Sequence, residues 1–147
     1  MKILLQRVIK SEVKIDDRTY SSTERGLLLF IGFTHSDNLN TIDFLVNKVL
    51  NLRIFEDDNG KMNLSVMDKQ GEIMLVSQFT LYGDTSRGRR PGFENSMKPE
   101  KASELFDKTV EYFKRSGLKI GTGVFGAEMQ VSLVNDGPVT FLLEKEI

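Results

Sequence analysis

The sequence predicts a single α+β domain in which a mostly antiparallel sheet, rolled toward a barrel, is covered by two helices. Two observations lead to this fold class. Two segments carry apolar residues at helical spacing, and the remaining apolar segments are short runs typical of strands. The 147 residues are enough for one hydrophobic core but not for two, so we expect one domain over residues 1–147.

The two helices are predicted from their apolar stripes. In the first, the positions i, i+3, i+4 and i+7 are occupied by Ile42, Leu45, Val46 and Val49. In the second, the stripe consists of Ala102, Leu105, Phe106, Val110 and Phe113. We expect the second helix to begin at Pro99, because proline is tolerated in a first turn, and to end near Gly117.

The strands are predicted from apolar runs and turn residues. Residues 2–15 and 18–22 flank a hairpin turn at Asp16 and Asp17, and residues 71–81 form another strand. The run GLLLFIGF at 26–33 is nearly all apolar, as in a strand that is covered on both faces. After the second helix, alternating apolar residues occur in the runs 118–124, 127–133 and 139–143. Their short connections predict antiparallel pairing among them.

Composition excludes several classes of function. The net charge of −1 argues against a generally basic nucleic-acid-binding protein, and we expect no DNA partner. The absence of cysteine and the single histidine exclude thiolate and multi-histidine metal sites, so we expect no metal and no cofactor. No apolar run approaches the roughly 20 residues that span a bilayer, and we expect a cytoplasmic protein without a membrane partner.

The segment Ser77-Gln78-Phe79-Thr80-Leu81 closes an apolar strand. Because side chains alternate along a strand, we expect Ser77, Phe79 and Leu81 to share one face. Gln78 and Thr80 would then project together from the other face, where they could position a carbonyl group and a water molecule or a nucleophile. The alternative is that both side chains simply face solvent on a half-exposed strand.

Conventional activation of a nucleophile is not supported. His35 lies in a loop just before a helix, which favours a surface or capping role over that of a catalytic base. The glycine pattern at 121–126 is interpreted as a chance match in a strand and turn, and Glu56-Asp57-Asp58 as a solvated turn.

The loop from Thr85 to Phe93 is the most concentrated basic segment of the chain. Arg87, Arg89 and Arg90 among glycines suit phosphate contacts, and Phe93 could stack on a base. The alternative is a solvated loop whose arginines pair with nearby acidic residues.

The segment VSLVNDGPVTFLLE at 131–144 places Pro138 at the head of a strand, where a proline donates no ladder hydrogen bond. The segment Asn135-Asp136-Gly137-Pro138 is therefore either an ordinary turn or a segment whose Gly-Pro pair faces another group.

Several segments, in this order and spacing, resemble the D-aminoacyl-tRNA deacylases. The two signature motifs are SQFTL at 77–81 and NDGPVT at 135–140. Further similar segments are QRV at 6–8, NLRIFED at 51–57, KMNLS at 61–65, RPGF at 90–93 and MQVSLVNDGPVT at 129–140.

The resemblance implies a homodimer with active sites at the subunit interface, without a metal ion. It implies hydrolysis of the ester that joins a D-amino acid to the 3′-terminal adenosine of tRNA, and of glycine attached to alanine tRNA. Gln78, Phe79 and Thr80 would be catalytic, with the Phe79 amide as an oxyanion donor. Residues that bind substrate or form the chiral filter would be Ser77, Met129, Arg7, Gly137 and Pro138.

Within this resemblance, Gly137-Pro138 is expected to be a cis peptide that reaches into the partner's site and excludes L-amino acids by its backbone shape. Arg7 would brace that segment. Thr80 would either attack directly or position water, and we favour hydrolysis assisted by the vicinal ribose hydroxyl. Two other functions stay open: a tRNA-end binding module without catalysis, and, less favoured because no triad can be assembled, a serine-type esterase.

Overall fold

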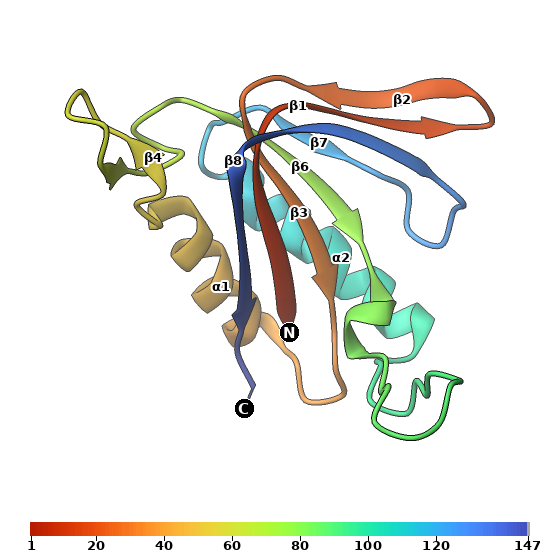
Figure 1. The fold of residues 1–147 in the computed structure, drawn as a ribbon. Helices are drawn as coiled ribbons and strands as arrows, with labels where there is room; N and C mark the ends of the chain where they lie inside the picture. The colour runs from red at the N-terminus through yellow and green to blue at the C-terminus, as the bar shows by residue number, and fades with distance from the viewer. Residues whose placement is uncertain (147) are drawn as a thin grey trace.

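A computed structural model describes residues 1–146 of the chain. One six-stranded sheet forms the body of the molecule, and two helices lie against one of its faces (Figure 1). Its strands are β1 (Lys2–Ile15), β2 (Arg18–Thr23), β3 (Gly26–Gly32), β6 (Glu72–Ser77), β7 (Ile120–Thr122) and β8 (Gln130–Glu144). A small separate ribbon contains β4 (Phe55–Glu56) and β5 (Met62–Leu64). The predicted α+β architecture, with two helices over a sheet rolled toward a barrel, is confirmed.

The sheet combines antiparallel and parallel pairs. Its order is β2-β1-β3-β6-β7, and β8 pairs with β1. All three pairs made by β1 are antiparallel, whereas β3–β6 and β6–β7 are parallel. Parallel neighbours need a crossover connection. Here α1 (Leu39–Asn51) lies in the crossover from β3 to β6, and α2 (Pro99–Lys114) in the crossover from β6 to β7.

The predicted antiparallel pairing of the last three runs is wrong. The first run contains β7, which returns from α2 to lie parallel to β6. The other two runs belong to one strand, β8, which continues through residues 135–140 and pairs with β1 along almost its whole length. Register shifts beside Val8 absorb the extra residues of β8. The segment 135–140 is therefore an irregular part of a strand and not a hairpin turn.

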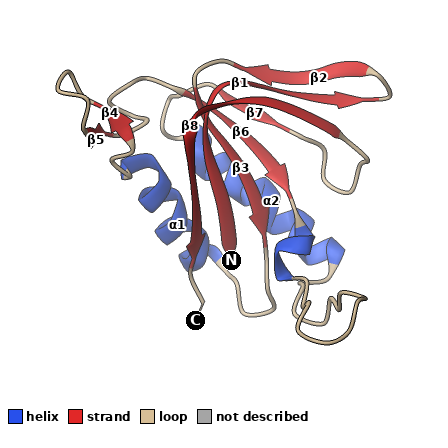
Figure 2. Cartoon of the chain, viewed as in Figure 1, coloured by secondary structure: helices blue, strands red, loops and turns tan. Residues whose placement is uncertain are grey.

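Local sequence explains how each helix begins. Asn38 caps α1: its side chain accepts hydrogen bonds from the Asn40 and Thr41 amides, and the Thr41 hydroxyl accepts one from the Asn38 amide. Pro99 stands in the first turn of α2, as predicted. Both helices cover the same face of the sheet (Figure 2).

The sheet buries apolar side chains on both of its faces. On the helix side, Leu27, Leu29 and Ile31 of β3 pack into the main core. On the other face, Leu28 packs with Met74 beneath the ends of the sheet that roll over it. The strand at 26–33 is thus covered on both faces, which confirms the prediction from its continuous apolar sequence.

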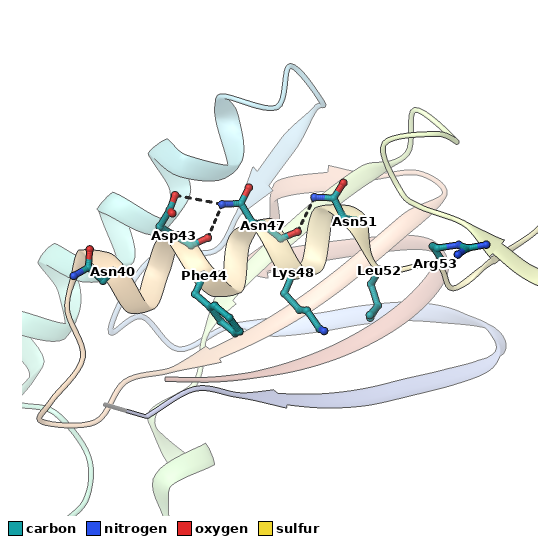
Figure 3. Close-up of a pocket in the computed structure, with 8 residues that line it drawn as sticks. All are labelled: Asn40, Asp43, Phe44, Asn47, Lys48, Asn51, Leu52 and Arg53. Atoms are coloured by element: carbon teal, nitrogen blue, oxygen red, sulfur yellow. Dashed lines mark hydrogen bonds between the residues drawn. The ribbon is translucent and has the colours of Figure 1, made fainter.

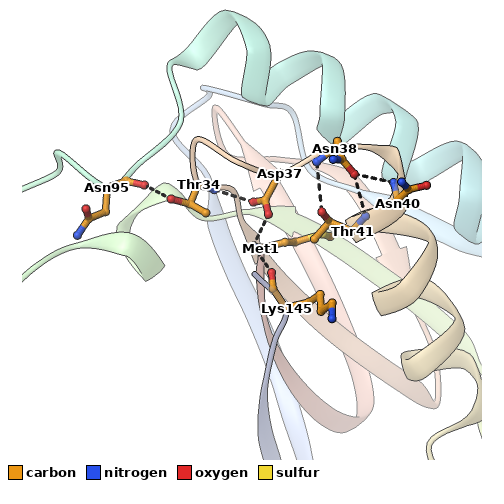
Figure 4. A network of polar contacts seen from close by, with 8 residues as sticks. All are labelled: Met1, Thr34, Asp37, Asn38, Asn40, Thr41, Asn95 and Lys145. Atoms are coloured by element: carbon orange, nitrogen blue, oxygen red, sulfur yellow. Dashed lines mark hydrogen bonds and ion pairs between the residues drawn. The ribbon is translucent and has the colours of Figure 1, made fainter. Parts of the chain in front are cut away.

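A polar network joins the start of β1 to the loop before α1 (Figure 4). The Met1 ammonium group donates to Asp37 Oδ1 at 2.6 Å, and the Thr34 amide donates to Asp37 Oδ2 at 2.7 Å. Both charged groups are fully buried. Burial lowers the pKa of the Met1 ammonium group, and the hydrogen bond to Asp37 partly opposes this shift. The network holds the loop that carries Thr34 in place beside the end of β3.

Over residues 1–146, neither helix is long and apolar enough to cross a membrane.

Candidate active site

The polar segment 77–81, predicted to continue a strand, lies at the end of β6. The strand ends at Ser77, and residues 79–82 form a short 3₁₀ helix. The prediction that Ser77, Phe79 and Leu81 share one strand face is therefore wrong, because the strand stops before the alternation can apply. Gln78 and Thr80 nevertheless lie together, and Gln78 Nε2 donates a hydrogen bond to Thr80 Oγ1. The structure thus brings the two polar groups into contact through a turn.

Phe79 is the exposed apolar residue of this turn. Its side chain is 56% exposed, and its ring lies 5.1 Å from the ring of Phe93, which is itself 43% exposed. Two exposed aromatic rings that touch one another suit contact with a base or another flat apolar group. The Phe79 carbonyl oxygen accepts a hydrogen bond from the Ser96 hydroxyl at 2.9 Å.

A hollow of about 670 Å³ opens beside this turn. Five predicted site residues line it, namely Ser77, Gln78, Phe79, Phe93 and Met129. Its other walls are mostly apolar and include Phe30, Val76 and Phe125. A volume of this size is in the range of small-molecule sites. The hollow therefore has the size and the combination of apolar walls and polar turn that an aminoacyl ester would need.

The three arginines of the basic loop lie outside the hollow. Arg87, Arg89 and Arg90 are exposed, in a loop closed by two backbone hydrogen bonds between Asp84 and Gly92. Because Phe93 follows directly, the loop begins at the edge of the hollow and extends into solvent. None of the three makes an ion pair within residues 1–146.

Gly137 and Pro138 lie elsewhere, beside Arg7. The peptide between them is cis, and Gly137 has φ +132°. Arg7 is buried and donates from Nε to the Asp136 carbonyl oxygen at 3.1 Å and from Nη1 to the Ile54 carbonyl oxygen at 2.6 Å. Arg7 therefore joins the segment before Gly137 to the chain that follows α1.

The two predicted halves of the site lie apart in the sheet: Gly137 and Pro138 are in the middle of β8, whereas Ser77 is at the end of β6. Asn135 pairs with Val8, which pairs with Gly26, which in turn pairs with Glu72 at the start of β6. Ser77 lies five residues further along β6, roughly 16 Å away at the rise of a strand. Gly137 and Pro138 do not line the hollow of the same chain.

A family model described as D-Tyr-tRNA(Tyr) deacylase matches residues 4–144. The chain belongs to this deacylase family.

Curated relatives of this deacylase family match over almost the full chain. A D-aminoacyl-tRNA deacylase of Clostridioides difficile (strain 630) is 51% identical over 144 residues, which cover 98% of this chain and 97% of the relative. One from Thermosipho africanus (strain TCF52B) is 49% identical over 146 residues, covering 99% and 98%. The family resemblance predicted from the motifs is confirmed.

Two solved structures share the fold of this deacylase family member. One, titled c-Myc DNA Unwinding Element Binding Protein, has a TM-score of 0.94 and 40% identity, with each chain fully covered. Another, titled as a probable eukaryotic D-amino acid tRNA deacylase, has a TM-score of 0.86 and 16% identity, with 97% of each chain covered, and shows likeness of fold.

The other sequence candidates do not join the site. His35 is exposed, and its Nε2 hydrogen-bonds the Glu94 carbonyl group at 2.6 Å, so the interpretation as a surface residue is confirmed. Asp57 accepts hydrogen bonds from the Asn59 and Lys61 amides, which lower its pKa and make 57–60 the predicted turn. Within residues 1–146, no three His, Cys, Asp or Glu side chains form a group that could hold a metal ion.

A second hollow, on the outer face of α1, carries none of the predicted residues (Figure 3). Two of its asparagine side chains bond to the helix itself: Asn47 Nδ2 donates to the Asp43 carbonyl oxygen, and Asn51 Nδ2 donates to the Asn47 carbonyl oxygen. These amide groups are occupied by local contacts, and the arrangement offers no evident chemistry.

Sequence reasoning missed two residues of the first hollow. Lys98 is the ionisable side chain that lines it within the described residues, and it directly precedes α2. Ser96 reaches the Phe79 carbonyl oxygen from the segment after the basic loop. Neither residue belongs to a motif, so no signal in the sequence pointed to them.

Proposed function

We propose that this family member hydrolyses the ester that joins a D-amino acid to the 3′-terminal adenosine of tRNA, and likewise glycine attached to alanine tRNA. The observation that carries the proposal is the contact of Thr80 with Gln78, which lines a mostly apolar hollow, in a chain of the deacylase family. Apolar walls would accept the amino-acid side chain, and the polar turn would face the ester. We expect the protein to act in the cytoplasm, because aminoacyl-tRNA is made in that compartment.

The proposed chemistry uses a positioned water molecule. Water attacks the ester carbonyl carbon, the ribose oxygen leaves with a proton, and the free amino acid and tRNA are released. The Phe79 amide would donate to the oxyanion, and the vicinal ribose hydroxyl would assist the proton transfer. Since Gln78 Nε2 donates to Thr80 Oγ1, the hydroxyl hydrogen of Thr80 stays free to be donated. This arrangement favours Thr80 as a positioning group over Thr80 as a nucleophile.

We also propose that the site is completed by a second copy of the chain. Gly137 and Pro138 lie in the middle of β8 and outside the hollow of their own chain, so they do not close it there. A two-fold dimer would bring each Gly137-Pro138 segment to the partner's hollow, where its backbone would face the substrate amino group and leave no room for an L side chain.

A partly exposed apolar row supports such a dimer. On the sheet face opposite the helices, Leu4 pairs with Leu142 on one side and with Phe30 on the other. Leu142 is 55% exposed, which is unusual for a large apolar residue that lies in a row with other apolar residues. A partner that covers this row would bury apolar area and stabilise the assembly.

A direct assay tests the proposed reaction. Purified protein is incubated with D-Tyr-tRNA, L-Tyr-tRNA and glycine attached to alanine tRNA, and the remaining ester is measured over time. We expect hydrolysis of the first and third substrates only. Binding of all three without hydrolysis would instead identify a tRNA-end binding module.

Mixed subunits test the shared site. The variant Thr80→Ala disables the catalytic turn of a subunit. The variant Gly137→Val disables the segment that a subunit would donate to its partner's site. If sites are shared, mixing the two inactive variants restores about a quarter of the wild-type sites, because half of the dimers are mixed and half of their sites are intact. No restored activity, or a fully active monomer in sedimentation, would reject the shared site.

A further inference from the structure

A short strap, residues 93–97, connects the basic loop to α2 and passes beside the candidate catalytic turn. The Thr34 hydroxyl donates to the Asn95 carbonyl oxygen at 2.6 Å (Figure 4), and the Met97 amide donates to the Phe33 carbonyl oxygen at 3.0 Å. His35 Nε2 adds a contact of 2.6 Å to the Glu94 carbonyl group. The strap is thus anchored to the loop after β3, which the buried pair of Met1 and Asp37 holds in turn.

On its other side, the strap touches Phe79 twice. The Phe93 ring packs against the Phe79 ring, and Ser96 Oγ donates to the Phe79 carbonyl oxygen at 2.9 Å. The Phe79 ring is mostly exposed, so the core does not hold this residue in place. The hydrogen bond from Ser96 adds a side-chain restraint to the peptide that joins Phe79 to Thr80 in the 3₁₀ helix.

We propose that Ser96 is a positioning residue for the catalytic turn. The inference rests on the proposed function, and it adds a residue that lies outside the two signature motifs. The Ser96 hydroxyl orients the Phe79–Thr80 peptide and through it the Thr80 hydroxyl, which contacts Gln78. It also restrains the preceding peptide, whose Phe79 amide is the proposed oxyanion donor. The strap also connects the arginine loop to the catalytic turn. Contacts of the loop with tRNA would therefore be transmitted to a turn whose position Ser96 restrains.

The Ser96 hydrogen bond should matter more for the geometry of the turn than for substrate affinity or the stability of the fold. One neutral hydrogen bond contributes little to the free energy of folding, so the fold does not depend on it. Catalytic groups, by contrast, must be held close to their productive geometry, and small displacements reduce the rate strongly. Loss of the Ser96 hydroxyl should therefore reduce kcat while KM and stability change little.

The test compares Ser96→Ala with Ser96→Thr, which keeps the hydroxyl group. We expect kcat for D-Tyr-tRNA to fall roughly tenfold in Ser96→Ala, with KM changed less than twofold. Ser96→Thr should recover most of the rate. Ser103→Ala, the same change on the surface of α2, serves as the control and should leave kcat unchanged.

A second readout does not depend on activity. Amide hydrogen exchange and the NMR shift of the Thr80 amide report directly on the Phe79–Thr80 peptide, and we expect both to change in Ser96→Ala but not in Ser103→Ala. If the wild-type protein hydrolyses no aminoacyl-tRNA, the proposed function fails, and this readout still tests the hydrogen bond. An unchanged kcat together with an unchanged Thr80 amide would overturn the proposal, as would equal loss of rate in Ser96→Ala and Ser96→Thr.

Discussion

Arg7 Nε donates a hydrogen bond of 3.1 Å to the carbonyl oxygen of Asp136, the residue that precedes Gly137. The same guanidinium group donates from Nη1 to the Ile54 carbonyl oxygen and lies 3.4 Å from the Asp136 carboxylate. A buried arginine thereby holds the irregular segment of β8 against the chain after α1. A planar guanidinium group can serve these acceptors together, whereas a lysine ammonium group cannot.

Replacing Arg7 should therefore affect both stability and function. Arg7→Ala leaves two carbonyl groups without their donor, and we expect the free energy of unfolding to fall by about 2–4 kcal/mol in urea denaturation. Arg7→Lys should recover part of the stability but not full deacylation. The matched control is Arg18→Ala on an exposed strand, which should change stability by less than about 0.5 kcal/mol. Equal effects at both positions would contradict the bracing role.

Gly137→Ala should weaken hydrolysis of D-aminoacyl-tRNA and of glycyl-tRNA alike. Gly137 has φ +132°, and an added Cβ would lie 2.9 Å from Val139 Cγ2 and 3.1 Å from the Val139 amide nitrogen. We expect a loss of about 1–3 kcal/mol in stability and no gain of activity on L-aminoacyl-tRNA, since added bulk creates no room. Gly60→Ala is the control, because Gly60 also has a positive φ but no atom within 4 Å of the added Cβ. Retained D-activity in a well-folded Gly137→Ala would show that the segment does not face substrate.

The arginine loop is expected to contact tRNA phosphates. Replacing Arg87, Arg89 and Arg90 together with Ala should weaken tRNA binding and reduce the slope of log K against log salt by about 1 for each phosphate that an arginine no longer neutralises. The melting temperature should change little, because exposed charges contribute little to stability. Binding is measured by fluorescence anisotropy at several salt concentrations.

Two controls separate a specific loop from a general charge effect. Replacing three exposed lysines elsewhere, Lys61, Lys101 and Lys114, removes the same charge and should reduce the slope less. A single-stranded DNA oligonucleotide tests whether the loop distinguishes tRNA from DNA. If the melting temperature falls sharply and binding is unaltered, the three arginines are structural.

Tyr82 should make stability sensitive to alkaline pH. Burial raises the pKa of its phenol group, and Tyr82 Oη has no hydrogen-bond partner within residues 1–146. Above pH of about 10 the unfolded chain loses this proton while the folded chain keeps it, so the unfolded state binds fewer protons and stability falls as pH rises.

Tyr82→Phe removes this titration. At neutral pH we expect equal or slightly greater stability, because a buried hydroxyl without a partner is removed. Between about pH 9 and 11 the variant should lose less stability than the wild type in urea denaturation. Tyr20→Phe, at an exposed tyrosine, should follow the wild-type pH dependence. Parallel curves for Tyr82→Phe and wild type would contradict the raised pKa.

Deacylation should survive extensive chelation, because the chain has no cysteine and one histidine from which to build a metal site. The assay is run with and without chelator at a fixed state of tRNA folding, since magnesium also acts on the tRNA. Activity that is lost in chelator and restored by one specific divalent ion would point to a carboxylate site.

The helices and most turns were predictable because their signals are local. The apolar stripe of α1 at Ile42, Leu45 and Val46 is set by the helical period, and Asp16 and Asp17 adopt the positive φ values of a tight hairpin turn. The partners of the last two strands, β6 for β7 and β1 for β8, were not predictable from local signals. Alternation shows that a segment is a strand, but the choice of partner depends on where α2 returns the chain.

The candidate site also combines features that the sequence predicts with features that depend on the tertiary structure. The sequence by itself determined the family, through motifs at 77–81 and 135–140, and the residue types available for chemistry. Only the tertiary structure decided that Gln78 and Thr80 meet in a 3₁₀ turn, that Ser96 reaches Phe79 and that Gly137 lies outside the hollow of its own chain. The contact of Ser96 with Phe79 and the place of Gly137 relative to the hollow join segments that are far apart in the chain, and the turn at Gln78 and Thr80 forms where the pairing of β6 with β3 ends at Ser77. Their geometry follows from the packing of whole strands and helices, which no local pattern encodes.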